Sequence, residues 1–500
     1  MPSRRLVTLA LFVATFLVSL DAAVVATAMP TVIGQIGGIG LYAWVFSAYL
    51  LASTVTVPIY GKLADLYGRK PVFLIATAIF LVGSMACGQS QSMQQLIAFR
   101  LLQGLGAGGV LPITQTVLGD VYPLAERARI TGVFSTIWGV SGLIGPAIGG
   151  FLTERASWRW VFYVNFPLCV LSMILISSFL HEQVKKRRHS IDALGALSLS
   201  GAVALLLLGL QSSQAGTSLG VPPSALYAVA AVLAIVFVWQ ERRAAEPLVP
   251  LHLFGIRIIG VGALIGVMIG VLLFGQSAFV PPFVQGVMGA TPTLAGFVLA
   301  GTSVGWPIAS TIGGRALLRL GFRIPCVLGG ALLSLGFALL WALPSTASLL
   351  VPAAIEVVIG AGFGFAAAVT IVAAQSAVGW EQRGVVTSAS QFARNIGGTV
   401  GVSLSGAIFA TGVGAAAGAG INPNDLLSPA SRVLLPATDL GFLQGILTAS
   451  LRSVYLLFVG VSVVATVLAA LLPGGRPEAA KETVPVPTPE AVTLGPSRNR

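Results

Sequence analysis

Charged residues are scarce in this sequence. Of its 500 residues, 9% are Asp, Glu, Lys or Arg, whereas 56% are hydrophobic. A soluble globular protein carries about 25% charged residues, so the chain lacks the charge that a water-exposed surface of its size requires. The alternative to a water-exposed surface is a lipid-exposed one. A helix needs about 20 apolar residues to cross a lipid bilayer. The alternating segments of about ten residues that mark a transmembrane β-barrel are not visible.

Residue patterns typical of metal sites, disulfides or catalysis are also scarce in this sequence. Cys87, Cys169 and Cys326 each lie inside an apolar stretch, which argues against disulfides and metal sites. No GxxxxGK[ST] nucleotide motif occurs, so a primary pump is not expected. We therefore expect no cofactor and no enzymatic activity. A membrane sensor is also disfavoured, because the sequence holds no sizeable segment outside the apolar stretches that could fold as a separate domain.

The apolar stretches predict an all-α polytopic membrane protein with 14 transmembrane helices. The expected spans are 6–28, 41–60, 72–89, 95–117, 130–151, 159–180, 192–211, 224–240, 257–284, 292–312, 325–343, 349–376, 385–412 and 453–472. Several of these spans contain Gly or Pro, which membrane helices tolerate because neighbouring groups satisfy the freed backbone.

The basic residues predict the orientation of the chain. The net charge is +12, but these residues are spread between apolar stretches and form no single patch, so nucleic acid is not an expected partner. With the N-terminus inside, the outer loops and the helices hold six of the 28 Lys and Arg: Arg155, Arg159, Arg432 and Arg452 in loops, and Arg100 and Arg394 in helices. Because cytoplasmic loops carry the excess of Lys and Arg, both termini are expected in the cytoplasm, with the protein in the plasma (inner) membrane.

A degenerate internal repeat predicts two similar halves. GKLADLYGRK at 61–70 is echoed by GRALLRLGFR at 314–323, an offset of 253 residues. GLGAG at 104–108 is echoed by GAGFG at 360–364, an offset of 256 residues. Chance similarity between Gly-rich apolar sequences is the alternative explanation. Two halves with a site between them are typical of secondary transporters.

The repeat and the loops together predict the domain boundaries. We expect an N-terminal six-helix bundle over 1–180, then a basic linker and two inserted helices, the seventh and eighth, over 181–256. A C-terminal six-helix bundle is expected over 257–472, with 413–452 as an outer loop that is flexible or holds a short amphipathic helix. The Pro- and Glu-rich tail, 473–500, is expected to be disordered and cytoplasmic.

GKLADLYGRK resembles the signature of the major facilitator superfamily between its second and third helices. In that family the Asp of the signature pairs with Arg near a helix end and latches one conformation. The resemblance implies a conformational latch formed by Gly61, Asp65, Gly68, Arg69 and Lys70. The second copy has Leu318 where Asp65 stands, so only the first half can form this ion pair.

A second motif implies the direction of transport. GVSGLIGPAIGG at 139–150 resembles the Gly/Pro motif of exporting members of the superfamily. Its residues Gly142, Gly145, Pro146, Gly149 and Gly150 are the candidate export motif. Small residues let another helix approach closely, and Pro146 removes one backbone hydrogen bond from its helix. Ordinary helix packing would also explain each glycine.

Further segments resemble the fourteen-helix drug:proton antiporters of the superfamily: LDAAVVATAMP at 20–30, WVFSAYLL at 44–51, RLLQGLGAG at 100–108 and WRWVFYVNFP at 158–167. The resemblance implies a monomeric, proton-coupled antiporter in the lipid bilayer that exports small lipophilic, cationic compounds by alternating access. Such multidrug efflux causes antibiotic resistance. Protons and a small-molecule substrate are the implied partners. An exporter of an endogenous metabolite or lipid and a proton symporter for uptake remain alternatives.

Three ionisable residues lie inside predicted spans at similar depth: Asp21, Arg100 and Glu356. A charged side chain at the centre of a bilayer costs at least about 2.5–3.5 kcal/mol, so each is a candidate functional residue. We expect all three to face a central cavity, with Asp21 as the proton carrier and Arg100 favouring its ionised form until the halves rock apart. Glu356 is a second proton site or the contact for a cationic substrate. A static buried salt bridge is the alternative for Asp21 and Arg100.

Overall fold

The computed structural model describes residues 2–122, 124–180, 192–212, 221–244, 251–379, 382–418, 424, 432 and 436–475, and in this part of the chain it contains helices but no strand. The N-terminal half consists of α1 (Pro2–Ile36), η1 (Ile39–Leu41), α2 (Tyr42–Tyr67), α3 (Arg69–Gly88), α4 (Met93–Val121), α5 (Leu124–Arg155), α6 (Trp160–Tyr163) and α7 (Asn165–Phe179).

Two helices separate this half from the next, α8 (Ala193–Ser212) and α9 (Pro223–Glu241). The C-terminal half consists of η2 (Leu251–Gly255), α10 (Arg257–Pro282), η3 (Phe283–Val287), α11 (Pro292–Leu320), α12 (Arg323–Trp341), α13 (Leu350–Ser376), α14 (Arg383–Gly418) and α16 (Ala437–Ala470). α8 packs against α9, α2 and α14, so the inserted pair contacts both halves.

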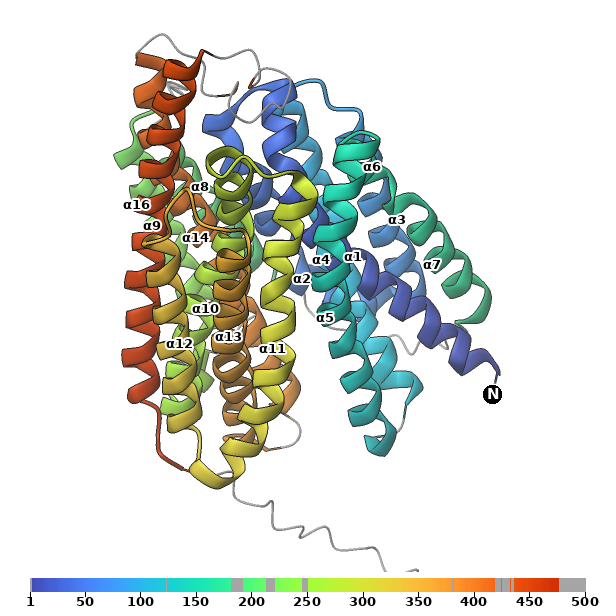
Figure 1. Cartoon of the computed structure of the whole chain (residues 1–500). Coiled ribbons are helices and arrows are strands. Elements are labelled where there is room, and N and C mark those ends of the chain that lie inside the picture. Colours follow the sequence, from blue (N-terminus) through green and yellow to red (C-terminus); the bar gives the residue numbers. More distant parts are fainter. Residues whose placement is uncertain are drawn as a thin grey trace, which may run out of the picture.

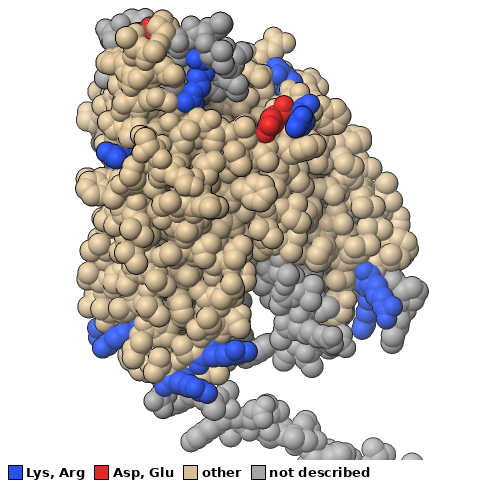
Figure 2. Space-filling view, viewed as in Figure 1, with Lys and Arg blue, Asp and Glu red and all other residues tan. Residues whose placement is uncertain are grey.

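The flank of the molecule is suited to lipid. Figure 2 shows a broad belt without charged side chains, with Lys and Arg near its two ends. Twelve helices in the described residues are long and apolar enough to cross a membrane. The two other expected spans coincide with α5 and with α8, whose apolar part is Leu194–Leu206. The described residues are therefore nearly all helical and the protein is a multi-pass membrane protein, and the count of fourteen spans stays a prediction.

Several helices are longer than the spans expected from hydropathy. α1 covers Pro2–Ile36 where 6–28 was predicted, and α16 begins at Ala437 where 453 was predicted. Hydropathy locates the apolar centre of a span, whereas helical hydrogen bonding continues into its flanks. The expected outer segment 413–452 is consequently helical at both ends, in α14 and α16. The basic linker 181–191 and the tail from 476 lie outside the described residues.

Equivalent glycines make equivalent contacts in the two halves, as the sequence repeat predicts. A methyl group on Gly104 of α4 would overlap the main chain of Tyr49 in α2, and one on Gly360 of α13 would overlap that of Thr302 in α11. The next glycines repeat this relation, because Gly106 faces α3 and Gly362 faces α12. Since each position needs a residue without Cβ for such close approach, the two motifs hold the same three-helix contact in each half.

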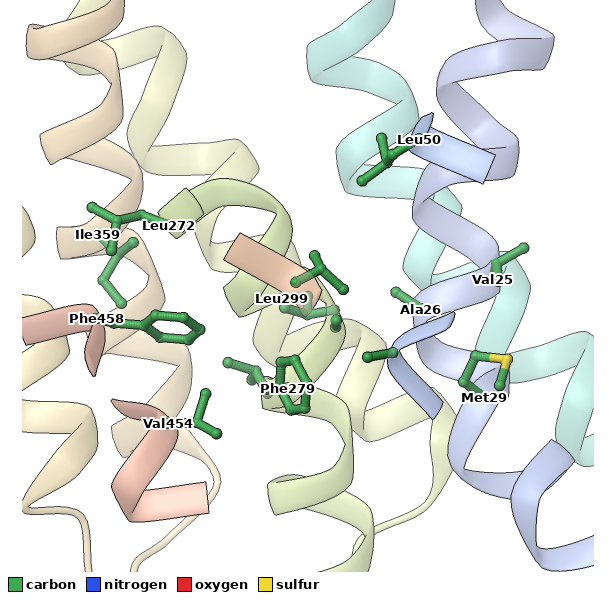
Figure 3. Packing of buried hydrophobic residues seen from close by; sticks show 14 of the residues in the cluster. Val25, Ala26, Met29, Leu50, Leu272, Phe279, Leu299, Ile359, Val454 and Phe458 are labelled. Atoms are coloured by element: carbon green, nitrogen blue, oxygen red, sulfur yellow. The ribbon is translucent and has the colours of Figure 1, made fainter. Parts of the chain in front are cut away.

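The two halves meet along α2 with α14 and along α5 with α11. We call the side of the molecule that holds Pro2 the N-terminal side, and the side that holds 37–41 and 288–291 the distal side. In Figure 1, α5 and α11 lie together toward the distal side and separate toward the N-terminal side. One buried apolar cluster runs through both halves, and Figure 3 shows Ala26 and Met29 of α1 on one side of it and Phe279 and Leu299 on the other.

Candidate functional site

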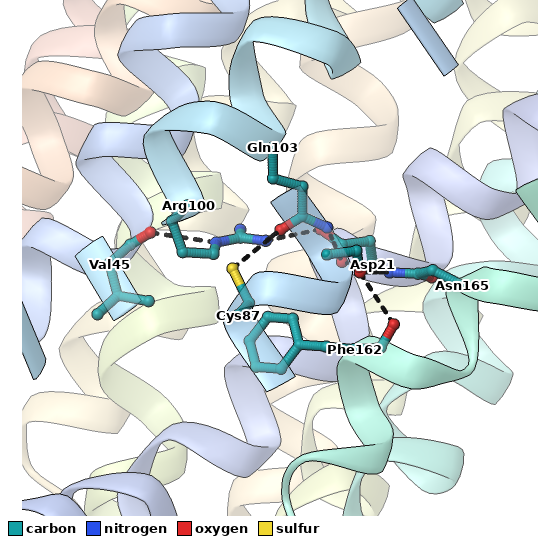
Figure 4. A network of polar contacts seen from close by, with 8 residues as sticks. Asp21, Val45, Cys87, Arg100, Gln103, Phe162 and Asn165 are labelled. Carbon is teal, nitrogen blue, oxygen red and sulfur yellow. Dashed lines mark hydrogen bonds and ion pairs between the residues drawn. The ribbon is translucent and has the colours of Figure 1, made fainter. Parts of the chain in front are cut away.

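The Asp21 carboxylate in α1 is held by three side chains of its own half. Its Oδ2 accepts a hydrogen bond from Arg100 Nη1 of α4 at 2.8 Å, which is also an ion pair. Its Oδ1 accepts from Gln103 Nε2 of α4 and Asn165 Nδ2 of α7, each at 2.9 Å. Figure 4 shows these four side chains converging between the helices. Both oxygens of the carboxylate are therefore satisfied by donors.

The Arg100 guanidinium is equally well held. Nη1 also donates to Gln103 Oε1 at 2.7 Å, and Nε donates to the carbonyl oxygen of Val45 at 3.4 Å. The Tyr49 ring lies beneath the guanidinium, with 4.0 Å from Cζ to the ring centroid. An arginine over an aromatic face gains cation–π attraction, which is strongest where water is excluded. The network is thus a paired charge in which Asn165 Oδ1 is buried without a hydrogen-bond partner among the described residues.

The expectation that these residues face a water-filled cavity is wrong for this conformation. The relative exposure is 1% for Asp21, 2% for Arg100 and 0% for Glu356. Asp21 and Arg100 also belong to the same half, so rocking of one half against the other as rigid bodies does not separate them. Hydropathy does not say which side of a helix faces a neighbour and which faces a cavity, and the similar depth of the three residues in the bilayer stays a prediction.

Glu356 in α13 lies in a different polar cluster, within the C-terminal half. Its Oε2 is 2.5 Å from the Thr302 hydroxyl of α11, which also lies 3.4 Å from the carbonyl oxygen of Glu356. Gln276 Nε2 of α10 donates to the same hydroxyl at 3.2 Å. Glu356 Oε1 and Gln276 Oε1 are buried without a hydrogen-bond partner among the described residues. The carboxyl group thus has a hydroxyl neighbour and no counter-ion there.

The two halves are closed against each other on the distal side by an aromatic cluster. The Tyr42 ring of α2 packs against Phe279 of α10, with ring centroids 5.5 Å apart, and against Phe409 of α14 at 6.1 Å. The Tyr42 hydroxyl donates to the carbonyl oxygen of Ala278. That carbonyl is available because Pro282, four residues on, has no N–H to donate. A proline in one half therefore creates the acceptor that the other half binds.

Other polar contacts join the halves on the same side. Gln285 Nε2 of η3 donates to the carbonyl oxygen of Thr27 at 2.9 Å, and the Ser47 and Ser403 hydroxyls lie 2.8 Å apart. Thr293 donates its hydroxyl proton to Glu154 at 2.7 Å. Buried polar groups that cross an interface favour a defined register, because misalignment would leave them unpaired.

The residues of the candidate export motif in α5 face two helices. Gly142 and Gly150 face α11, where methyl groups would overlap Ser303 and the main chain of Thr293. Gly145 and Gly149 face Ala23 and Val24 of α1. The carbonyl oxygen of Pro146 lies where a methyl group on Gly296 of α11 would stand. The motif thus packs α5 on its own half and on the other half at once.

The candidate latch lies at the turn between α2 and α3. Gly68 has φ +96°, which favours glycine, and its N–H donates to the carbonyl oxygen of Ala64 at 3.0 Å. Gly61 precedes it by two helical turns, and a methyl group added to it would meet nothing within 4 Å outside its own helix. Arg69 begins α3. The Asp65 side chain lies outside the described part of the structure, so its pairing with Arg69 stays a prediction.

The second copy of the signature repeats this turn. Gly321 has φ +77° and donates to the carbonyl oxygen of Leu317 at 3.0 Å, 253 residues after Gly68 and Ala64. Lys70 Nζ donates to the carbonyl oxygen of Ser177 near the end of α7 at 2.6 Å. Its counterpart, Arg323 Nε, donates to that of Leu472 after α16 at 2.8 Å. In each half, one basic residue therefore joins the third helix to the end of the last helix, where the helix dipole favours a cation.

Sequence reasoning missed Gln103, Asn165, Gln276, Thr302 and Tyr42. Gln103 had a usable signal, because it lies three residues after Arg100 and such residues share a helix face. Asn165 was a lone amide in an apolar segment. No sequence signal marked Tyr42, Gln276 or Thr302, because their importance comes from contacts between segments far apart in the chain. Among the described residues, no three His, Cys, Asp or Glu side chains are grouped as metal ligands.

Comparisons with known proteins agree with the fold. The chain is 36% identical over 408 residues to the multidrug transporter protein MdtP of Bacillus subtilis, covering 81% of this chain and 75% of that protein. It is 31% identical over 473 residues to multidrug resistance protein 3 of the same organism, covering 91% and 92%. A solved bacterial homologue of the human lysosomal transporter Spinster, in an inward-facing and unoccupied conformation, superposes with a TM-score of 0.65 at 17% identity, covering 94% and 97%.

The family model of the Major Facilitator Superfamily matches residues 11–402. Transporters of this family are multi-pass membrane proteins, which agrees with the apolar belt and the twelve candidate spans. The relatives are named as transporters, which points away from an enzyme. The chain belongs to the Major Facilitator Superfamily.

Proposed function

We propose that the protein is a proton-coupled antiporter that exports small lipophilic, cationic compounds from the cytoplasm by alternating access. The names of its relatives support the substrate class, since both Bacillus subtilis proteins are named for multidrug transport or resistance. The buried ionisable residues Asp21, Arg100 and Glu356 support the coupling, because such residues within a membrane protein mark ion and substrate pathways. Export requires a source of energy, and the proton gradient supplies it without a cofactor.

The closed distal side is the structural observation that best supports this proposal. With both termini in the cytoplasm, as the basic residues predict, the distal side is the outer side. Tyr42, Phe279 and Phe409 then close the outer side, while α5 and α11 separate toward the cytoplasm. This is the conformation in which an exporter admits its substrate. The opposite conformation requires these contacts to break and the candidate latch around Asp65 to close the cytoplasmic side.

The candidate export motif fits the same scheme. Gly142, Pro146 and Gly150 bring α5 against α11 where the halves meet, and the glycines facing α1 fix α5 to its own half. A contact between two glycine-containing helix surfaces is tight but contains few interlocking side chains. We propose that the two bundles, 1–180 and 257–472, pivot along this contact, with the protein acting as a monomer.

Ethidium transport tests the function. Inverted membrane vesicles from cells that produce the protein are given an interior acid pH gradient, and ethidium accumulation is followed by fluorescence. We expect accumulation that stops when an ionophore collapses the gradient and that is absent from vesicles lacking the protein. Gradient-driven accumulation that is equal with and without the protein, for ethidium and for a panel of other lipophilic cations, would refute the proposal.

A further inference from the structure

Each half holds one buried polar cluster at an equivalent place, but the clusters differ in charge. In the N-terminal half, Arg100 of α4 has Tyr49 of α2 against it and is paired with Asp21. In the C-terminal half, Glu356 of α13 has Thr302 of α11 against it. Thr302 is equivalent to Tyr49, because the two residues are separated by the 253-residue offset of the repeat. The first cluster is electrically balanced. The second contains one acid and no base.

Asp21 is poorly placed to take up a proton in this network. Three donors from Arg100, Gln103 and Asn165 bond to its two oxygens, and each bond favours the ionised carboxylate. Protonation would also leave the Arg100 charge uncompensated at 2% exposure. Removing one partner of a buried ion pair is strongly destabilising, because it leaves the other charge buried and uncompensated. The pair is therefore stable as two ions.

Glu356 has the opposite surroundings. Its side chain is fully buried, its Oε1 has no partner among the described residues, and no guanidinium or ammonium group there contacts it. Tyr455 of α16 interacts electrostatically with Glu356. It is the ionisable side chain that does so among the described residues of α10, α11, α12, α14 and α16. The Tyr455 hydroxyl is engaged by the carbonyl oxygen of Phe279 at 3.1 Å. An unpaired carboxylate in such a place carries a large desolvation penalty, whereas a neutral carboxylic acid does not.

We propose that Glu356, and not Asp21, takes up and releases the coupling proton, with Thr302 and Gln276 as its positioning residues. This inference rests on the proposed proton-coupled function. In the conformation described here, Glu356 holds the proton as a neutral acid shielded from water. When water from the cytoplasmic side reaches the side chain, the O–H bond breaks and the proton passes to that water. After the halves move to the outer-open conformation, the carboxylate accepts a proton from the outer side. No electron transfer and no other reactant is needed.

Thr302 can serve both protonation states without moving. Its single hydroxyl proton has two acceptors in reach, Glu356 Oε2 at 2.5 Å and the main-chain oxygen of Glu356 at 3.4 Å. With the carboxylate ionised, the hydroxyl donates to Oε2. With the acid protonated on Oε2, the carboxyl donates to the hydroxyl, which turns its own proton to the main chain. Gln276 Nε2 donates to the hydroxyl oxygen and holds it in place.

Infrared spectroscopy of the purified full-length protein tests the assignment without any substrate. A buried protonated carboxyl group gives a C=O stretching band well separated from those of carboxylates. We expect this band in the wild type, its loss in Glu356→Gln, and its persistence in the double variant Asp21→Asn/Arg100→Gln, which removes the ion pair as a unit. A band that persists in Glu356→Gln, or that vanishes in the double variant, would overturn the assignment.

The same band tests the positioning residues. We expect Thr302→Val to shift it, because a hydrogen bond to the carboxyl group is lost, and Thr302→Ser to restore its position. Gln276→Leu should shift it less, since Gln276 acts through Thr302. An unshifted band in a folded Thr302→Val protein would show that Thr302 does not position the acid.

Transport separates this inference from the proposed function. In proteoliposomes with ethidium as the probe, we expect Glu356→Gln to move ethidium at equal rates with and without a pH gradient, whereas the wild type is accelerated by the gradient. A gradient effect in Glu356→Gln as large as in the wild type overturns the role of Glu356 and leaves antiport standing. Absence of a gradient effect in the wild type refutes antiport itself, whatever the infrared band shows.

Discussion

The Tyr42 hydroxyl of the N-terminal half binds the carbonyl oxygen of Ala278 in the C-terminal half, at a place where Pro282 has removed the helical donor. Tyr455 has the same relation to the next carbonyl, that of Phe279, because the Phe283 N–H bonds to Val280 instead. Both tyrosines satisfy a carbonyl at the disturbed end of α10. Only Tyr42 does so across the contact between the halves, and this difference makes the pair a matched test of closure.

Tyr42→Phe is expected to weaken distal closure. The ring still packs on Phe279 and Phe409, but the carbonyl oxygen of Ala278 loses its donor, which costs about 1–3 kcal/mol when the group stays buried. Because 1.4 kcal/mol is a factor of ten in an equilibrium, the distal-open population should rise roughly tenfold. Distances between spin labels on the distal ends of α2 and α14, measured by electron resonance, would report this change.

Tyr455→Phe is the control for this experiment. It removes an equally buried hydroxyl, but its acceptor lies in its own half. We expect it to lower thermal stability in detergent and to leave the distance distribution as in the wild type. If Tyr455→Phe opened the distal side as far as Tyr42→Phe, closure would depend on the shape of α10 and not on the bond between the halves.

The ion pair predicts an unusual order of stabilities. Asp21→Asn keeps the shape of the side chain but leaves the Arg100 charge unbalanced, and breaking a buried pair in this way costs about 3–5 kcal/mol. Asp21→Asn/Arg100→Gln removes both charges and should be more stable than Asp21→Asn, despite its extra substitution. Melting temperatures of the purified variants in one detergent would measure the order. A double variant less stable than the single would mean that each residue is held by other contacts.

The sequence predicted the general architecture because that depends on local pattern. Low charge, apolar spans and the spacing of Gly104 and Gly360 sufficed for the helices and for the repeat. Asp21, Arg100 and Glu356 could be selected because an ionisable group in an apolar span stands out. The sequence could not predict that Asp21 pairs with Arg100 inside one half or that Glu356 stands alone. Both features depend on how the helices turn toward one another.

The export motif gives a prediction about α5 and α11. A methyl group on Gly150 would overlap the main chain of Thr293, which cannot move aside as a flexible side chain can. We expect Gly150→Ala to push the helices apart, destabilise the distal-closed conformation and reduce ethidium export severalfold. Gly414→Ala near the end of α14 is the matched control, since nothing lies within 4 Å of its Cβ position. Equal export by the two variants would show that this close approach is not needed for transport.

The number of spans can be decided at the connection between α8 and α9. If α8 crosses the membrane, fourteen helices place this connection outside, together with the distal ends of the other helices. A single cysteine introduced there should react in intact cells with a thiol reagent that does not cross membranes. The native Cys87, Cys169 and Cys326 are buried and need not be replaced. A cysteine in the tail after α16 is the internal control, protected in intact cells and labelled after permeabilisation. If the α8–α9 cysteine shared that protection, α8 and α9 would not cross as a pair and the chain would have twelve spans.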